Sequence, residues 1–327
     1  ARAAELAHHA ALSGDGGLAA RAMVAAGRLC LRFFANSEAL ALARKGLQLA
    51  QQLSELQRIC VTLELHDIAL AAAAPDDHDA AALQYVALAE AALDHGALEH
   101  ARLGYTMASY VRWSCGQWRS AHEQTLQAER ITRNGTEEEH IVGLAETAKC
   151  LAMLERDLGQ AEAMLMEARA LAQRRRFSIP AIAAASGMLR FHKNDLPAAS
   201  EHFHEARALS KAAGDRMQEF QANEYLIMID FEQSNYAAAA ARCSELTQLG
   251  EKLRHGSEAP FAHALNALCQ YALNGISDAL PISLQALRVA DAKHRLAYIL
   301  TRAALLDIAR DDVDCAYQHA GEALQYA

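Results

Sequence analysis

The chain has 327 residues, 52% of them hydrophobic, with 31 basic and 40 acidic side chains and a formal net charge of −9. The negative charge disfavours direct contact with nucleic acid, and no apolar run of about 18 residues predicts a membrane span. Seven widely spaced cysteines, an odd number, do not suggest a disulfide framework, so we expect reduced thiols and a cytoplasmic location.

Helical patterns fill the chain from its beginning, where residues 1–12 already read as a helix. Prolines and glycines are few, and no segment alternates apolar and polar residues as a strand would. The sequence therefore predicts helices throughout, arranged in pairs. The expected pairs are 15–34 with 37–53, 54–73 with 76–95, 96–115 with 117–133, 136–156 with 158–174, 177–193 with 195–212, 215–233 with 235–253, 256–274 with 276–291, and 292–310 with 312–327.

A small residue near the start of each second helix recurs about every 37 to 41 residues. In the clearest unit Ala199, Phe203 and Ala206 follow at i, i+4 and i+7, so they share one face that a neighbouring helix approaches closely. A fixed period in this range is typical of a solenoid of stacked hairpins. The eight repeat starts are Ala39, Ala80, Ala121, Ala161, Ala199, Ala239, Ala279 and Ala316.

Turn signals precede each of these starts. Asn, Asp, Gly and Pro favour turns and helix caps because they accept unusual backbone angles or bond to free backbone groups. The eight turns are Ala35–Asn36, Ala74–Pro75–Asp76, Cys115–Gly116, Asp157–Leu158–Gly159, Asn194–Asp195, Ser234–Asn235, Asn274–Gly275 and Asp311–Asp312.

The pattern Asn194-Asp195-Leu196-x-x-Ala199-x-x-x-Phe203-x-x-Ala206 resembles the tetratricopeptide repeat, as do residues 157–168 and 235–246. The units here are about four to six residues longer than the 34 residues of that repeat, so longer helices are expected. The resemblance implies an all-α, right-handed superhelix of about eight hairpins and about 17 helices. We expect one domain over residues 1–327.

Stretched repeats of this kind are typical of the sensor arms of bacterial signalling ATPases of the STAND class, including activators similar to the maltose-operon regulator. The first fifty residues look like the segment that follows the ATPase and winged-helix modules of those proteins. Both ends stop inside helical patterns, so we expect a piece of a longer protein. The chain itself contains neither a P-loop nor a recognisable DNA-binding helix-turn-helix.

Candidate catalytic and metal motifs are weak. His202 and His204 are two residues apart and diverge on a helix, whereas ligands of one metal need i, i+3 or i+4 spacing. No His-Glu-x-x-His, Gly-x-Ser-x-Gly or Cys-x-x-Cys motif occurs. We therefore expect no metal, no cofactor and no enzyme, and a helical enzyme with a cryptic site remains a third hypothesis.

The first helix of each pair suggests a binding surface, because in a tetratricopeptide-like superhelix the first helices line the concave wall. Eight residues before each start the chain holds core-type residues, among them Met153, Tyr271 and Ile308. Nine and twelve before lie polar and small residues, basic in the middle repeats and acidic later. We expect the partner to contact Arg112, Trp113, Lys149, Arg190, Phe191, Asp230, Phe231 and Gln270.

The sequence thus predicts a non-enzymatic arm that binds a protein, a peptide or a small effector within a bacterial signalling or transcription regulator. A freestanding peptide-pheromone receptor or scaffold is the alternative, and a solvated face without a ligand is also open. Apolar residues at the two ends predict self-association, namely Leu6, Leu12, Leu324 and Tyr326.

Overall fold

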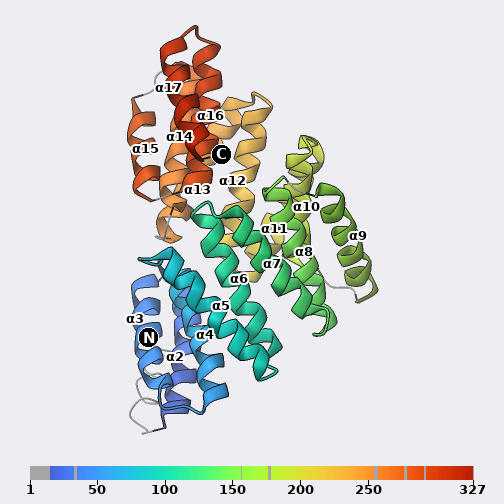
Figure 1. The fold of residues 1–327 in the computed structure, drawn as a ribbon. Coiled ribbons are helices and arrows are strands. Elements are labelled where there is room, and N and C mark those ends of the chain that lie inside the picture. The colour runs from blue at the N-terminus through green and yellow to red at the C-terminus, as the bar shows by residue number, and fades with distance from the viewer. Residues whose placement is uncertain are drawn as a thin grey trace. The chain divides into compact units, whose positions relative to one another are not determined.

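A computed structural model describes residues 15–32, 35–155, 157–175, 178–253, 257–275, 278–290 and 292–326. In these ranges it contains sixteen α-helices and one 3₁₀ helix, Leu324–Tyr326, and no strand (Figure 1). The predicted all-α class is confirmed. No helix in the described part of the chain combines the length and apolar character needed to cross a bilayer.

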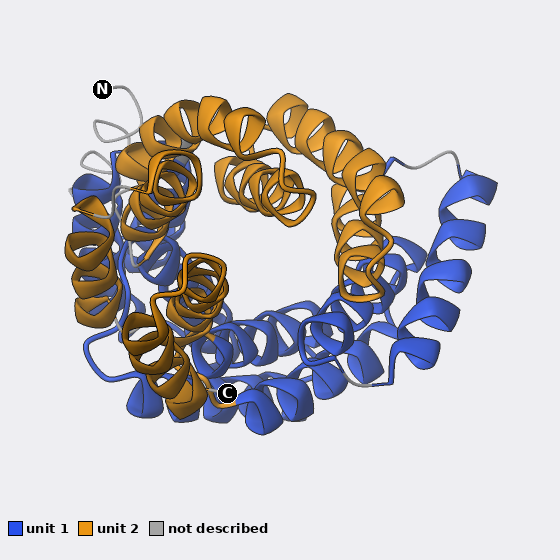
Figure 2. Cartoon of the chain, turned by 90° about the horizontal axis from the view of Figure 1, so that it is seen from above, with its two compact units in different colours: residues 1–113, 118–178 blue, residues 114–117, 179–327 orange. Residues whose placement is uncertain are grey.

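Contacts divide the chain into two compact units, shown in two colours in Figure 2. Unit 1 comprises residues 1–113 and 118–178, and unit 2 comprises 114–117 and 179–327. The helices that begin in unit 1 are α2 (Gly16–Arg32), α3 (Asn36–Ala50), α4 (Glu55–Ala72), α5 (His78–Asp94), α6 (Leu98–Ser114), α7 (Trp118–Thr132), α8 (Glu137–Met153) and α9 (Leu158–Arg175). The helices of unit 2 are α10 (Pro180–His192), α11 (Leu196–Ala213), α12 (Arg216–Glu232), α13 (Tyr236–Leu253), α14 (Glu258–Asn274), α15 (Ala279–Val289), α16 (Lys293–Ile308) and α17 (Val313–Ala323).

Consecutive helices pack against one another in both units, and some of the even-numbered first helices also contact one another, as α2 and α4 do in unit 1. In unit 2, for example, α12 contacts α14, and α14 contacts α16. This is the one-dimensional stacking of a helical-repeat solenoid, in which a hairpin buries its apolar face against its neighbours.

The small-residue stripe that defined the repeat lies in the core. Ala199, Phe203 and Ala206 are 0%, 1% and 1% exposed, as predicted. Two repeats differ from the prediction, because Ala80 and Ala279 are exposed. In α5 the buried stripe runs instead through Ala82, Tyr85, Ala89 and Ala92, and in α15 it runs through Leu280, Ser283, Leu284 and Leu287.

The predicted turns close the hairpins through the backbone. One residue in each of six turns has a positive φ, which reverses the chain after the first helix: Gly116, Asp157, Asn194, Ser234, Gly275 and Asp311. Glycine, asparagine and aspartate tolerate this left-handed conformation better than most residues. Asp195 and Asp312 then accept hydrogen bonds from the first turns of α11 and α17.

The sequence analysis predicted that Ile308 would lie in the core, but it does not. It is 60% exposed, because in the described part of the chain no later first helix packs against this end of α16.

Candidate functional site

The free side of α14 forms the centre of the candidate site. This helix contacts α12, α13, α15 and α16, so most of its surface is covered by neighbours. The side that stays open carries His263, Asn266, Gln270 and Leu273, which follow at i, i+3, i+7 and i+10 and therefore share one face. Gln270 is exposed and accepts a hydrogen bond from Asn274 at 3.1 Å.

Side chains of α16 extend this surface toward α12. Tyr298 donates a hydrogen bond to Glu232 at 3.0 Å, and the Nε of Arg302 lies 2.6 Å from the same carboxylate. Leu305 continues the stripe of Tyr298 and Arg302 one turn further and is 51% exposed. We call this surface the first-helix face and define it by Glu232, Asn266, Gln270, Leu273, Tyr298, Arg302 and Leu305.

A buried ion network holds the same three helices together. Arg295 of α16 is 5% exposed and donates to Glu258 of α14 at 2.8 Å and to Glu224 of α12 at 2.9 Å. Its guanidinium also lies over the buried rings of Phe220 and Phe261, with 5.6 Å and 5.1 Å to their centroids. Buried charges are tolerated when they are paired and hydrogen-bonded in this way. The network connects the three helices that carry the first-helix face.

The phenol of Tyr298 has a strongly shifted pKa on this face. Burial, with the nearby Glu232 carboxylate, raises the pKa of Tyr298 well above its ordinary value. The phenol therefore stays protonated and acts as a donor to Glu232. Glu232 accepts the hydrogen bond of Tyr298 and forms an ion pair with Arg302, so contacts within the chain hold its carboxylate.

The predicted partner-binding residues of unit 1 all have contacts within the chain. Arg112 of α6 forms an ion pair with Asp79 of α5, and only 17% of its side chain is exposed. Lys149 pairs with Glu146 at 3.2 Å. The ring of Trp113 lies against those of Trp118 and Tyr110, 6.3 Å and 6.4 Å away.

In unit 2 the predicted charged residues bond to their own hairpins. The nearest atoms of Arg190 and Asp195 are 4.0 Å apart, and Asp230 accepts a bond from Arg242 of α13 at 2.7 Å. Gln270 is exposed and belongs to the first-helix face.

The predicted aromatic residues of unit 2 serve mainly in packing. Phe231 is 6% exposed. The ring of Phe191 meets that of Tyr225 edge-on at 5.3 Å. Any contact these two rings make with a partner would therefore be at their edges.

Ser109 and Gly187 lie twelve residues before the repeat starts Ala121 and Ala199. Each of them faces the second helix of its own hairpin. Ser109 is buried and donates to the carbonyl of Ala121 at 2.8 Å. A Cβ on Gly187 would lie 2.9 Å from the ring of Phe203. Small size at these positions therefore permits close helix packing rather than leaving room for a ligand.

Sequence reasoning missed Glu232, Tyr298 and Arg302. These residues lie outside the columns eight to twelve residues before each repeat start, where the sequence analysis placed the binding surface. The i, i+4 spacing of Tyr298 and Arg302 placed them on one side, but nothing in the sequence linked that side to Glu232, 66 residues from Tyr298.

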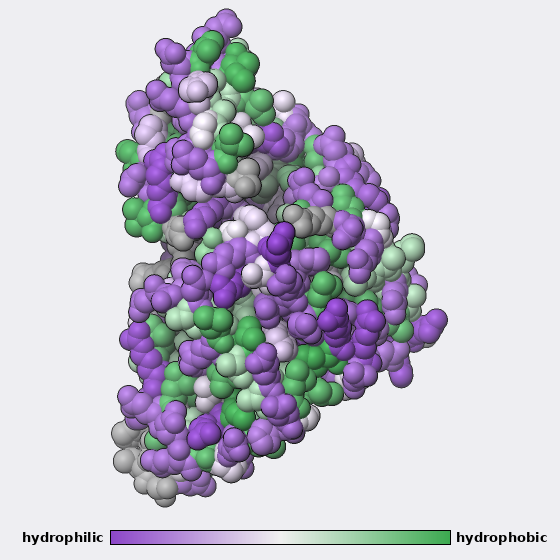
Figure 3. All heavy atoms as spheres, viewed as in Figure 1, coloured by the Kyte–Doolittle hydropathy of each residue, from purple (hydrophilic) through white to green (hydrophobic). Residues whose placement is uncertain are grey.

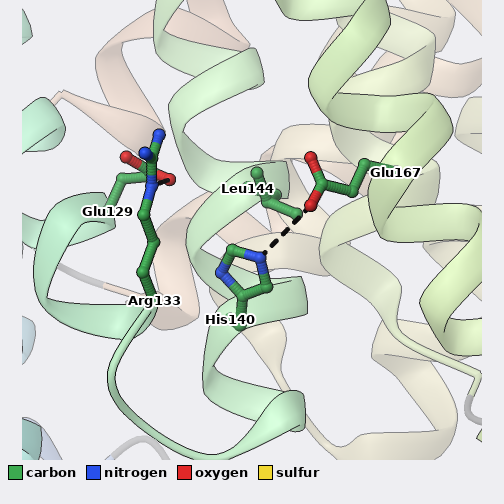
Figure 4. Close-up of a pocket in the computed structure, with 5 residues that line it drawn as sticks. All are labelled: Glu129, Arg133, His140, Leu144 and Glu167. Carbon is green, nitrogen blue, oxygen red and sulfur yellow. Dashed lines mark hydrogen bonds and ion pairs between the residues drawn. The ribbon is translucent and has the colours of Figure 1, made fainter.

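Unit 1 contains a separate pocket among α7, α8 and α9, shown in Figure 4. Its volume is about 340 Å³, within the usual range for small-ligand sites. Polar side chains predominate around it, as they do over the surface drawn in Figure 3, where apolar residues are scattered among polar ones. The pocket is lined by Glu129, Arg133, His140, Leu144 and Glu167.

Comparisons with known proteins identify the fold. No protein-family model matches the chain, and no curated protein sequence does either. Among solved structures, the chain is similar to a Rap protein complexed with competence and sporulation factor, with 14% identity, a TM-score of 0.59, and coverage of 95% of this chain and 98% of that one. It is also similar to the apo form of RapI, with 13% identity, a TM-score of 0.53, and coverage of 75% and 97%. At this identity the likeness establishes a tetratricopeptide-like solenoid and nothing finer.

Proposed function

We propose that the chain is a non-enzymatic, peptide-binding repeat protein that holds its ligand on the first-helix face. The observation that carries this proposal is the composition of the open side of α14. Asn266 and Gln270 each offer an amide donor and an amide acceptor, which match the N–H and C=O groups of an extended peptide. Leu273 and Leu305, 44% and 51% exposed, offer apolar contacts beside them.

The dimensions suit a short ligand. From His263 to Leu273 the stripe rises ten residues, or about 15 Å at 1.5 Å per residue. An extended peptide covers this length with about five residues at roughly 3.3 Å each. The charges of Glu232 and Arg302 lie at the side of the stripe and would orient a ligand more than they would tighten it.

The likeness to a Rap protein solved with a bound factor supports the peptide-receptor hypothesis better than the sensor arm of a STAND ATPase. We therefore prefer the alternative that the sequence analysis placed second. The seven free cysteines agree with a reducing, cytoplasmic setting for such a receptor.

A peptide-display selection tests this function. The full chain is immobilised and panned with a random library of short peptides, and affinities of recovered peptides are measured by calorimetry. We expect the double variant Gln270→Ala with Leu305→Glu to weaken binding at least about tenfold.

The matched control carries the same kinds of change on the exposed side of α15, Gln285→Ala with Ile282→Glu, and should bind as the wild type does. Equal loss in both double variants, or none in either, would place the peptide elsewhere.

A further inference from the structure

The pocket of unit 1 contains a buried carboxylate with an incomplete set of partners. Glu129 of α7 is 2% exposed. Within the described ranges it receives one side-chain hydrogen bond, from the Nε of Arg133 at 2.6 Å, whereas a carboxylate offers about four acceptor positions. Burying such an ion costs several kcal/mol, and several hydrogen bonds are needed to offset that cost.

Arg133 is not buried with its partner. Its side chain is 60% exposed, and it directly follows the last residue of α7. An ordinary i, i+4 pair on a helix surface exposes both side chains and contributes a few tenths of a kcal/mol. Here the carboxylate lies within the pocket and the guanidinium reaches it from the solvent side.

Two further side chains of the pocket, His140 and Glu167, can also accept hydrogen bonds. The Nε2 of His140 lies 3.5 Å from a carboxylate oxygen of Glu167, and the Nδ1 is buried and has no hydrogen-bond partner in the described part of the chain. A neutral ring that donates from Nε2 leaves Nδ1 as an acceptor. Figure 4 shows Glu129 and Glu167 on opposite sides, with Leu144 and His140 between them.

Local packing holds this arrangement in place. The side chain of Thr136 and that of Glu139 cap the start of α8 reciprocally, which fixes the first turn that carries His140. At Gly143 an added Cβ would lie 2.3 Å from the Oγ1 of Thr132, so α7 and α8 approach closely beside the pocket.

We propose that this pocket binds an alkyl guanidinium group, and that Arg133 occupies part of the site when no ligand is present. A guanidinium has five N–H donors and no acceptor, which complements two carboxylates and a ring nitrogen. Leu144 provides an apolar wall for the alkyl stem. The site is independent of the first-helix face, because its residues lie on α7, α8 and α9 of unit 1.

The test uses calorimetry on the full chain with two probes, agmatine for a free ligand and N-acetyl-arginine amide for an arginine within a polypeptide. N-acetyl-citrulline amide, a neutral analogue of the same shape, is the control ligand. We expect at least one guanidinium probe to bind at least about tenfold more tightly than the citrulline compound. The tighter of the two probes indicates which source the site favours.

Variants separate this site from a structural ion pair. Glu129→Gln should weaken guanidinium binding at least about tenfold, whereas Glu123→Gln on the exposed side of α7 should leave it unchanged. Arg133→Ala should strengthen binding, because it removes the internal competitor. If Glu129→Gln fails to fold, Glu167→Gln replaces it in the test, because Glu167 is half-exposed. This variant should also weaken guanidinium binding.

Three results would overturn the proposal. The first is binding of both guanidinium probes that is no tighter than binding of the citrulline compound. The second is binding by Glu167→Gln and Arg133→Ala that matches the wild type. The third is the lack of measurable binding by either guanidinium probe at millimolar concentration.

Discussion

Arg295 of α16 and Glu224 of α12 form an ion pair of 2.9 Å, although 71 residues separate them in the chain. Arg295 also bonds to Glu258 of α14, so one guanidinium joins the first helices of three successive hairpins. Solenoid repeats usually contact only their nearest neighbours. This network therefore couples α12 directly to α16, beneath the surface where we place the ligand.

Removing Arg295 should strongly destabilise unit 2. Arg295→Met leaves Glu224 and Glu258 buried without their partner, and breaking a buried pair in this way costs about 3–5 kcal/mol. Urea unfolding followed by circular dichroism measures the loss. Arg207→Met is the control, because the Arg207–Glu245 pair lies nearer the surface, with side chains 25% and 52% exposed, and should matter by less than about 1 kcal/mol. Similar small losses in both variants would mean that the network contributes little.

Stability should fall on mild acidification because of His294. Burial, assisted by the charge of neighbouring Arg295, lowers the pKa of His294 well below its ordinary value. The unfolded chain then takes up a proton near pH 6.5 that the folded chain does not, so this contribution is complete above that pH and is lost as the pH falls. The loss is at most about 1.4 kcal/mol per pH unit.

Melting temperatures at about pH 7.5 and about pH 5.5 test the role of His294. His294→Gln should reduce the difference between them, whereas His263→Gln, at a side chain that is 51% exposed, should not. If both variants keep the wild-type difference, other groups cause the acid sensitivity.

Gly104 permits α6 to pack closely on α5. A Cβ at this position would lie 2.8 Å from the Cβ of Ala89 and 2.9 Å from the carbonyl oxygen of Tyr85. Gly104→Ala should therefore destabilise the chain by about 1–3 kcal/mol, measured by urea unfolding. Gly159→Ala meets no atom within 4 Å and should be neutral or stabilising by up to about 1 kcal/mol. Equal stability of the two variants would show that the helices adjust freely.

The outer side of α17 should promote self-association. Val313 and Tyr317 are 71% and 82% exposed and lie one turn apart, and Leu324 beyond them is 76% exposed. Light scattering over a hundredfold range of concentration should show growth in mass, and Val313→Glu with Tyr317→Lys should suppress it. A constant monomer mass for the wild type would contradict this prediction. Leu6 and Leu12, also predicted to contribute, lie outside the described residues.

The repeat period and the turns could be predicted from the sequence because both depend on local chemistry. Asn194, Ser234 and Gly275 adopt the left-handed conformation that their turn signals indicated. The buried residue at the start of each second helix was harder to predict, because alanine is frequent. Ala80 and Ala82 fit the repeat pattern equally well. Only tertiary packing selects Ala82.

The candidate sites were less predictable than the fold. Counting columns correctly placed Gln270 on an exposed side of its helix, but it could not show that Arg112 and Asp230 pair with Asp79 and Arg242. The position of a residue within the repeat predicts the direction of its side chain, but it does not predict which residues that side chain contacts. In the pocket, the i, i+4 spacing of Glu129 and Arg133 is visible in the sequence. The burial of Glu129, but not of Arg133, depends on tertiary packing such as that of α7 against α8.

Photo-crosslinking tests the central claim, that a peptide binds on the first-helix face, most directly. A peptide recovered by selection is synthesised with a photoreactive residue, irradiated with the full chain, and its attachment sites are mapped by mass spectrometry. We predict attachment on α14 and α16, in residues 258–274 and 293–308, competed by the unmodified peptide. Attachment confined to α15, α17 or unit 1 would contradict this account, as would a selection that yields no peptide.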